Sequence, residues 1–194
     1  MNEELALYDA ISQYAVLPTE EWRHLSERIR RRWFEPGAFL IRAGDMPGEF
    51  HFISKGLVQM SYPNQEGQAA VKSFAQEGEM TGPLLAWLAN EASPLDIRAI
   101  EYTETMALSS TLLPDLLRRH PAWEKIVSGY IEALARRMEN RARSFMENTP
   151  ESRYINFLRD ESSLGNRLPL NQVAAYLGIT AVSLSRIRRR LNNR

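Results

Sequence analysis

The stretch LPLNQVAAYLGITAVSLSRIRRRL, residues 168–191, decides the interpretation of this 194-residue chain. Its first half has apolar residues at the spacing i, i+3, i+4 and i+7, which predicts a short amphipathic helix. Gly178 follows where a left-handed residue would end that helix, and Thr180 has the hydroxyl expected at the N-cap of a second one. Two short helices joined by a tight glycine turn are a helix-turn-helix, whose second helix enters the major groove of DNA. The inner stripes are Leu170, Val173, Ala174 and Leu177 in the first helix, and Leu184, Ile187 and Leu191 in the second.

The outer face of the second helix carries the side chains expected to contact DNA. Arg186 and Arg189 can each donate two hydrogen bonds to guanine, and Ser185 can bond to a base edge or to a phosphate. Side chains near the helix N-terminus favour phosphate contacts, because the helix dipole attracts anions there. The alternative is a helical hairpin that packs on the rest of the chain and leaves a solvated arginine face. The predicted DNA-binding residues are Thr180, Ala181, Val182, Ser183, Ser185, Arg186, Arg189 and Arg190.

The charge distribution favours DNA binding. Residues 162–194 contain six arginines and no acidic residue, a net charge of +6; because the chain has 24 basic and 24 acidic residues, residues 1–161 carry −6. An acidic body with a basic end indicates that only this end meets a polyanion. The pentapeptide RIRRR of the second helix also occurs at Arg28–Arg32, but among glutamates. We expect that copy to end an N-terminal helix capped by Thr19 and to be structural.

The composition excludes several classes of site. The chain has no cysteine, so disulfides, thiolate zinc sites, iron–sulfur clusters and cysteine nucleophiles are ruled out. The N-terminus is acidic where a signal peptide is basic, and no apolar run approaches the length of a membrane span, so we expect a cytoplasmic protein without a membrane partner. No phosphate loop, zinc helix or nucleophile elbow occurs, and we predict no enzyme activity, no metal and no cofactor. His24, His51 and His120 are interpreted as surface or core residues.

The region from Trp33 to Ser109 predicts an antiparallel sandwich or barrel. Short apolar or alternating runs are separated by glycines at a spacing typical of turns, and NQEGQ at 64–68 is typical of a hairpin tip. One short helix is expected between Gly78 and Ser93, where the apolar residues do not alternate. The strand-like runs are FLI (39–41), FHFI (50–53), LVQMSY (57–62), VKSF (71–74), IRAI (97–100) and TMALS (105–109).

From Ser110 onward the apolar period becomes helical. A short helix with Pro114 in its first turn is followed, after Pro121, by a helix of roughly 25 residues, about 37 Å long. Because this helix is longer than a small β-barrel is wide, we expect its apolar stripe to pack on a second subunit. A further helix starts with Thr149 as N-cap and Pro150 in its first position. The predicted dimer-interface residues are Trp123, Val127, Tyr130, Leu134 and Met138.

The order of these elements resembles the Crp/Fnr family of bacterial transcription regulators. The residues that carry the resemblance are PGAFLIRAGD (36–45), FHFISKGLVQM (50–60), IRAIEYTETMALS (97–109), HPAWEKIVSGYIEALARRM (120–138) and QVAAYLGITAVSLSRIRRRL (172–191). The resemblance implies an α+β fold: an antiparallel β-roll of the cyclic-nucleotide-binding, jelly-roll type with flanking helices in residues 1–119, a long dimerisation helix in 120–147, and a helix-turn-helix in 148–194. It also implies a homodimeric, sequence-specific DNA-binding regulator, with RNA polymerase and a small-molecule effector as further partners.

Three departures from the family argue against tight binding of cyclic AMP. The family's phosphate-binding cassette has Gly-Glu, whereas here Gly82 is followed by Pro83. Its arginine slot falls at Ala92 or Ser93, and Arg98 matches a strand residue outside the cassette. Arg141 and Ala142 occupy the long-helix positions where hydroxyl groups would reach the adenine. A buried cyclic phosphate would therefore lack its counter-charge, which costs several kcal/mol. The residues around the cassette either line an apolar effector pocket or fill the core, namely Thr81, Gly82, Leu84, Leu85, Trp87 and Ser93.

The helix-turn-helix also departs from the family. Ala181 and Val182 stand where many members have arginine or proline and then glutamate, so only thymine methyl contacts are available there. Arg186 matches the base-reading arginine of the family. The sequence ends three residues after Leu191, so the β-hairpin wing that usually follows is expected to be missing. The rival interpretation is a ligand-sensing or protein-interaction module whose helix-turn-helix no longer reads sequence.

Overall fold

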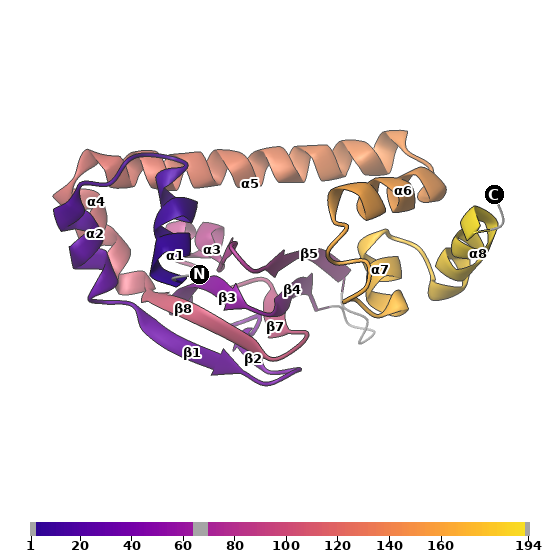
Figure 1. Cartoon of the computed structure of the whole chain (residues 1–194), viewed down its shortest axis with the longest axis horizontal. Helices are drawn as coiled ribbons and strands as arrows, with labels where there is room; N and C mark the ends of the chain where they lie inside the picture. The colour runs from indigo at the N-terminus through magenta and orange to yellow at the C-terminus, as the bar shows by residue number, and fades with distance from the viewer. Residues whose placement is uncertain (1–2, 64–69, 193–194) are drawn as a thin grey trace.

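A computed structural model describes residues 3–63 and 70–192 and has an α+β fold (Figure 1). The strands form the lower part of the molecule, and one long helix, α5, runs above them from one end to the other. The N-terminal helices α1 and α2 lie at one end with α4, whereas α6, α7 and α8 lie at the opposite end. The hairpin tip predicted at 64–68 lies outside the described residues.

The strands form two four-stranded sheets in which every pairing is antiparallel. We call these two sheets the roll. The first sheet has the order β1-β8-β3-β6, with β1 (Arg30–Phe34), β8 (Thr103–Ser109), β3 (Glu49–Lys55) and β6 (Met80–Thr81). The second has the order β2-β7-β4-β5, with β2 (Phe39–Ile41), β7 (Asp96–Ala99), β4 (Leu57–Tyr62) and β5 (Ala70–Gln76). The predicted antiparallel architecture is confirmed.

The prediction for the first arginine-rich segment is wrong in its structure. Helix α2 (Thr19–Ser26) ends before this segment, and β1 begins at Arg30, so Arg30–Arg32 belongs to an edge strand rather than to a helix. The backbone hydrogen bonds of this strand come from β8. Because β8 is far away in the sequence, the local spacing of apolar residues could not predict this pairing. Two of these three arginines are nevertheless neutralised, since Arg31 pairs with Glu3 at 2.9 Å and Arg32 with Glu49 at 2.7 Å. Pro18, not Thr19, occupies the N-cap of α2.

The helices form where capping residues and apolar spacing predicted them after Ser110. Pro114 lies in the first turn of α4, and the Thr149 hydroxyl accepts a hydrogen bond from the Ser152 amide at 3.2 Å at the start of α6. The helices besides α2 are α1 (Glu3–Ser12), α3 (Leu84–Ala89), α4 (Leu113–Arg119) after a 3₁₀ turn (Ser110–Leu112), α5 (Pro121–Glu147), α6 (Pro150–Asp160), α7 (Leu170–Tyr176) and α8 (Ala181–Asn192).

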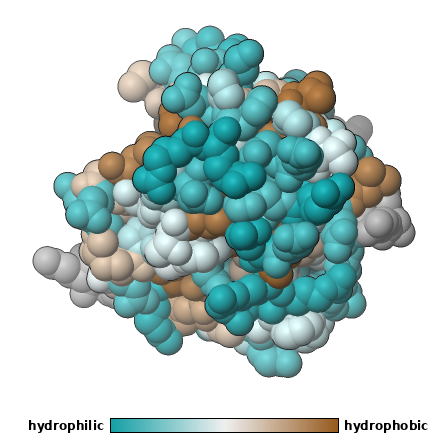
Figure 2. Space-filling view, turned by 90° about the vertical axis from the view of Figure 1, so that its left-hand side faces the viewer, coloured by the Kyte–Doolittle hydropathy of each residue, from teal (hydrophilic) through white to brown (hydrophobic). Residues whose placement is uncertain are grey.

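The first turns of α5 are buried in the chain's own core. Trp123 is 3% exposed, and its indole nitrogen donates a hydrogen bond of 2.8 Å to Glu21, which Arg119 also contacts. The bond from Trp123 is the main reason that the pKa of Glu21 lies below its usual value despite burial. The chain thus buries Trp123, which the sequence assigned to a dimer interface, in its own core. The surface at this end, over α2 and α4, is mainly hydrophilic (Figure 2).

A second core joins the C-terminal helices to the roll. We call α6, α7 and α8 the C-terminal unit. Its apolar side chains pack against strand residues of β4 and β5, so the unit and the roll are held together by burial as well as by polar contacts. The buried members are Leu57, Val71 and Phe74 from the roll, and Tyr154, Phe157, Leu164, Leu168, Val173, Ala174, Leu177, Leu184 and Ile187 from the C-terminal unit and its α6–α7 loop.

A neutral histidine lies inside the first sheet. His51 on β3 is 3% exposed, lies 3.0 Å from the Thr105 hydroxyl, and packs edge-on against Phe34. Burial lowers its pKa from 6.5 to about 4, because the charged imidazolium would lose its hydration; the nearby Glu49 carboxylate only partly offsets this. His51 is thus a core residue, as the sequence indicated.

The depressed pKa of His51 predicts a loss of stability in mild acid. Between pH 6.5 and pH 4 the unfolded chain binds a proton at this residue and the folded chain does not, so the free energy of unfolding falls as the pH falls, by up to about 1.4 kcal/mol per pH unit. His51→Gln removes this contribution. Urea unfolding at pH 7 and pH 5 should show a smaller acid-induced loss in the variant than in the wild type; equal losses would contradict the prediction.

Candidate nucleic-acid interface and ligand cavity

The turn between α7 and α8 has the geometry that the sequence predicted. Gly178 has φ of +68°, and the Ile179 amide donates to the Ala174 carbonyl at 3.0 Å, which closes the end of α7. The Thr180 hydroxyl accepts a hydrogen bond of 3.1 Å from the Ser183 amide and so caps α8. A Cβ on residue 178 would lie 2.7 Å from the Phe145 ring of α5, so the turn is also seated against the long helix.

Helix α8 buries one face and exposes the opposite one. Leu184 is 0% exposed and Ile187 is 4% exposed, whereas Val182 is 61% exposed. Ser185, Arg186 and Arg189 lie on the exposed side, as the helical phase predicted.

The arginines of α8 differ in their partners. Among the described residues, Arg186, Arg188 and Arg189 have no hydrogen bond or ion pair with another side chain. Arg190 contacts Glu151 of α6 at 3.1 Å. Of the predicted DNA-binding residues, Ala181 is half-buried, and the hydroxyls of Thr180 and Ser183 bond to each other at 2.9 Å. The exposed face of α8 therefore carries Arg186 and Arg189, which are unpaired within the described residues, and Arg188 flanks it.

Two further arginines connect the long helix to the end of α7. Arg141 donates hydrogen bonds to the Val71 carbonyl of β5 at 3.0 Å and to the Tyr176 carbonyl of α7 at 2.8 Å. Arg153 of α6 donates to the Leu177 carbonyl at 3.2 Å. Both guanidinium groups lie over the ring of Phe145. These contacts satisfy carbonyls that a helix end leaves open, and they join β5, α5 and α7 at one point.

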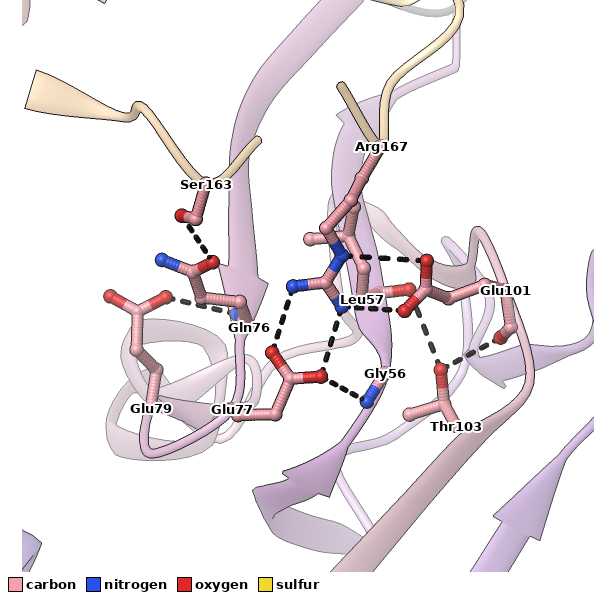
Figure 3. A network of polar contacts seen from close by, with 9 residues as sticks. All are labelled: Gly56, Leu57, Gln76, Glu77, Glu79, Glu101, Thr103, Ser163 and Arg167. Carbon is pink, nitrogen blue, oxygen red and sulfur yellow. Dashed lines mark hydrogen bonds and ion pairs between the residues drawn. The ribbon is translucent and has the colours of Figure 1, made fainter. Parts of the chain in front are cut away.

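A third arginine fastens the C-terminal unit to the roll (Figure 3). Arg167 donates two hydrogen bonds to Glu77 at 2.8 and 2.9 Å and also contacts Glu101. Partial burial opposes ionisation of Glu77, but the bonds from Arg167 and from the Gly56 amide outweigh it, so the pKa of Glu77 lies below its usual value. Beside this network the Ser163 hydroxyl donates to Gln76 at 2.8 Å.

A cavity of about 600 Å³ lies between the roll, α1 and the middle of α5. Of the predicted pocket residues, Gly82, Leu84 and Leu85 line it. Thr81, Trp87 and Ser93 do not. The Thr81 hydroxyl is directed at the Met60 sulfur, the Ser93 hydroxyl donates to the Leu95 carbonyl at 2.7 Å, and the Trp87 ring packs edge-on against Phe50. The cavity thus extends from Gly82, Leu84 and Leu85 toward α5.

The long helix supplies one wall of this cavity. Tyr130, Leu134 and Met138, which the sequence assigned to a dimer interface, line the cavity, and Val127 is half-buried nearby on the helix. The Tyr130 hydroxyl donates to the Met80 carbonyl at 3.0 Å. This part of the predicted stripe therefore faces the chain's own roll across the cavity.

Sequence reasoning missed the charged groups of the cavity. Glu79 and Arg137 form an ion pair at 3.0 Å at its edge, and Lys72 of β5 lines it without a hydrogen bond or ion pair to another described residue. The signal in the sequence was the lysine inside the apolar run VKSF, which we interpreted only as part of a strand.

The residues at which this sequence departs from the cyclic-nucleotide cassette make other contacts or provide no donor. Pro83 follows Gly82 and provides no amide donor. Arg98 lies on β7 and donates to the Gly37 carbonyl at 2.8 Å, as expected for a strand residue outside the cassette. Arg141 is engaged with Val71 and Tyr176. None of these arginines is among the residues that line the cavity.

Within residues 3–63 and 70–192, no cluster of three or more histidine, aspartate or glutamate side chains is arranged to hold a metal ion. No helix in the same ranges is long and apolar enough to cross a membrane.

Comparisons with known proteins place the fold. Residues 31–120 match the family model of the cyclic nucleotide-binding domain. No curated protein matches the sequence. CLP of Xanthomonas campestris, a c-di-GMP responsive global regulator, aligns with a TM-score of 0.72 and 16% identity over 91% of this chain and 92% of its own. FixK2 of Bradyrhizobium japonicum aligns with a TM-score of 0.75 and 13% identity over 85% of each chain. The catabolite activator protein of Thermus thermophilus aligns with a TM-score of 0.59 and 19% identity over 95% of this chain and 87% of its own.

The Arg167 network predicts that docking of the C-terminal unit is partly ionic. Arg167→Gln should lower the free energy of unfolding by about 1 kcal/mol, because the pairs are only partly buried. The same substitution should also speed amide hydrogen exchange in α7 and β5. Arg159→Gln is the matched control, since Arg159 pairs only with its neighbour Asp160 on the surface. Equal exchange rates in α7 for the two variants would contradict a docking role for Arg167.

Proposed function

We propose that this chain is a homodimeric, sequence-specific DNA-binding transcription regulator of the Crp/Fnr type, with α7 and α8 as its helix-turn-helix. The structural relatives are Crp/Fnr regulators with the same overall fold, which supports this class. The same comparisons and the regulator fold favour a non-enzymatic role.

The exposed arginine face of α8 is the observation that carries the proposal. Arg186 and Arg189 extend from a capped helix whose opposite side is buried, so the helix presents them in a fixed direction, and Arg188 flanks this face. By contrast, Arg141, Arg153 and Arg167 donate hydrogen bonds to carbonyl or carboxylate groups of the chain itself. Unpaired arginines in an acid-free region instead match a polyanion such as the DNA backbone.

The contacts with DNA follow from the positions of the side chains on α8. Arg186 and Arg189 would reach base edges, with Arg186 donating a bidentate pair to guanine. Val182 would contact a thymine methyl. Arg188 and Arg190 flank this face and would contact phosphates, and Arg190 would then leave its ion pair with Glu151. We call the outer side of α8 that carries Val182, Arg186 and Arg189 the recognition face.

We place the dimer seam on a stripe of α5 that neighbours the predicted one. Ile131, Ala135, Met138 and Ala142 recur at spacings of 4, 3 and 4 residues, which is the heptad pattern of a two-stranded helical interface. Ala135 and Ala142 are exposed, and their small side chains allow two helices to approach closely. Pairing of two long helices would hold two recognition faces about one helical turn of DNA apart, which predicts a palindromic site.

DNA binding is tested first by selecting bound sequences from random duplexes with purified wild-type protein. We expect a palindrome that is bound more tightly than random DNA. Arg186→Ala should weaken binding to it by about 1–3 kcal/mol per lost base contact and should relax the selected sequence at one position of each half-site.

Arg188→Ala is the matched substitution on the same helix. It should weaken binding to the palindrome and to random DNA alike, and it should make the salt dependence of binding shallower by about 2 for a dimer. If the protein binds both kinds of DNA equally, or neither, the rival function of a ligand-sensing or interaction module is favoured. An unchanged motif with Arg186→Ala would refute the assigned base contact alone.

The dimer seam predicts a specific change in molecular mass. Ala142→Glu introduces a charge at the C-terminal end of the proposed interface and should shift sedimentation velocity from dimer to monomer. Asn140→Glu places the same charge on the exposed face away from the seam and should leave the dimer intact. A wild-type chain that sediments as a monomer, or equal behaviour of the two variants, would contradict the proposed seam.

A further inference from the structure

The cavity contains one cationic side chain whose charge is not balanced. Lys72 lines it and has no hydrogen bond or ion pair with another described residue, whereas Arg137 at the rim is paired with Glu79. Burial lowers the pKa of Lys72, as expected for an ammonium group that has lost part of its hydration. Most of the remaining lining is apolar or aromatic, and its acidic residue Glu79 is the one paired with Arg137.

A β-bulge directs this lysine into the cavity. On β4 and β5, Met60 pairs with Ser73 and Ser61 pairs with Val71, so Lys72 has no partner in the register. A bulge of this kind breaks the alternation of side chains and re-aims one of them. Lys72 and Ser73 consequently both line the cavity, while Val71 and Phe74 both pack against the C-terminal unit.

We propose that the cavity binds an amphipathic carboxylate, a small molecule with an alkyl or aryl body and one anionic end, and that Lys72 is its counter-ion. This proposal names the effector class of the proposed regulator and so rests on that function for its biological role. The apolar walls from α3 and α5, among them Leu84, Leu134 and Met138, would enclose the body of the ligand. The volume of about 600 Å³ is typical of small-molecule sites.

The chemistry of the cavity favours a carboxylate over a nucleotide. A nucleotide carries a ribose and a base that need several hydrogen-bond partners, and unpaired polar groups in such a site reduce affinity. Here Tyr130 is already engaged with the Met80 carbonyl, and the Ser73 hydroxyl is directed at the Met60 sulfur. One lysine facing apolar walls instead matches a ligand with one charge and few other polar atoms.

The same bulge links the cavity to the C-terminal unit. The Val71 carbonyl, one residue before Lys72, accepts the hydrogen bond from Arg141, whose guanidinium also holds the Tyr176 carbonyl at the end of α7. A ligand that draws Lys72 toward its carboxylate therefore acts on the strand that holds Arg141. Binding at the cavity would in this way change the position of α7 and α8.

Displacement of the fluorescent anion 8-anilinonaphthalene-1-sulfonate from the full-length protein tests the ligand class. Decanoate should displace the probe, whereas 1-decanol, which has a similar body without the charge, should do so at least tenfold less effectively. Cyclic AMP should not displace it. Lys72→Met should weaken decanoate at least tenfold and leave 1-decanol unchanged, and Lys72→Arg should retain most of the decanoate affinity.

Lys125→Met is the matched control, because Lys125 lies exposed on α5 and is absent from the lining of the cavity. Equal decanoate affinity in wild type and Lys72→Met, no displacement by decanoate, or equal displacement by decanoate and 1-decanol would each overturn the proposal. Thermal melting of each variant identifies one that fails to fold, and Lys72→Arg then decides the outcome. DNA binding measured without ligand is a separate readout, so failure of the regulator function is distinguished from failure of the ligand class.

Discussion

The packing of Val71 and Phe74 against the C-terminal helices is the constraint on which the arrangement of this molecule depends. Both side chains leave the roll on the same side because the bulge at Lys72 interrupts the alternation of β5. In a regular strand, side chains alternate between the two faces, so Val71 and Phe74, three residues apart, would lie on opposite faces. One of them would then face the cavity, and the shared core would lose a large apolar side chain. The bulge thus serves the docking of the C-terminal unit and the lining of the cavity at once.

Polar contacts fix the orientation of the C-terminal unit on the roll, to which the apolar core attaches it. Apolar packing has little directional preference, whereas a guanidinium that donates to two carbonyls fixes their separation. Arg141 does this for β5 and α7, and Arg167 does it for α6–α7 and the roll through two carboxylates. The acidic body and the basic end of the chain therefore meet at a few paired sites, while the arginines on the outer face of α8 stay unpaired within the described residues.

The parts of the fold that depend on near neighbours could be predicted from the sequence. The ends of α7 and α8 follow from Gly178 and Thr180, because a left-handed residue and a capping hydroxyl act within one turn. Strand β1 could not be predicted in the same way, since its arginines also fit a helical face and only the pairing with β8 decides between the two. Lys72 was missed for a related reason, because a bulge is a property of two paired strands and not of either sequence alone.

The long helix illustrates how one sequence pattern can have two physical meanings. Its apolar residues indicated a single stripe, yet the stripe through Trp123, Tyr130 and Leu134 faces the roll, where the first of these is buried and the others line a cavity. The residues left for a partner are smaller and occupy the next stripe, where alanines contribute little hydrophobicity and are easily overlooked. Because Ile131, Ala135 and Met138 of the proposed seam also line the cavity, a bound ligand and a partner helix would contact the same side chains. The proposed effector binding and dimer geometry would then be coupled through α5 itself, in addition to the proposed connection through β5 and Arg141.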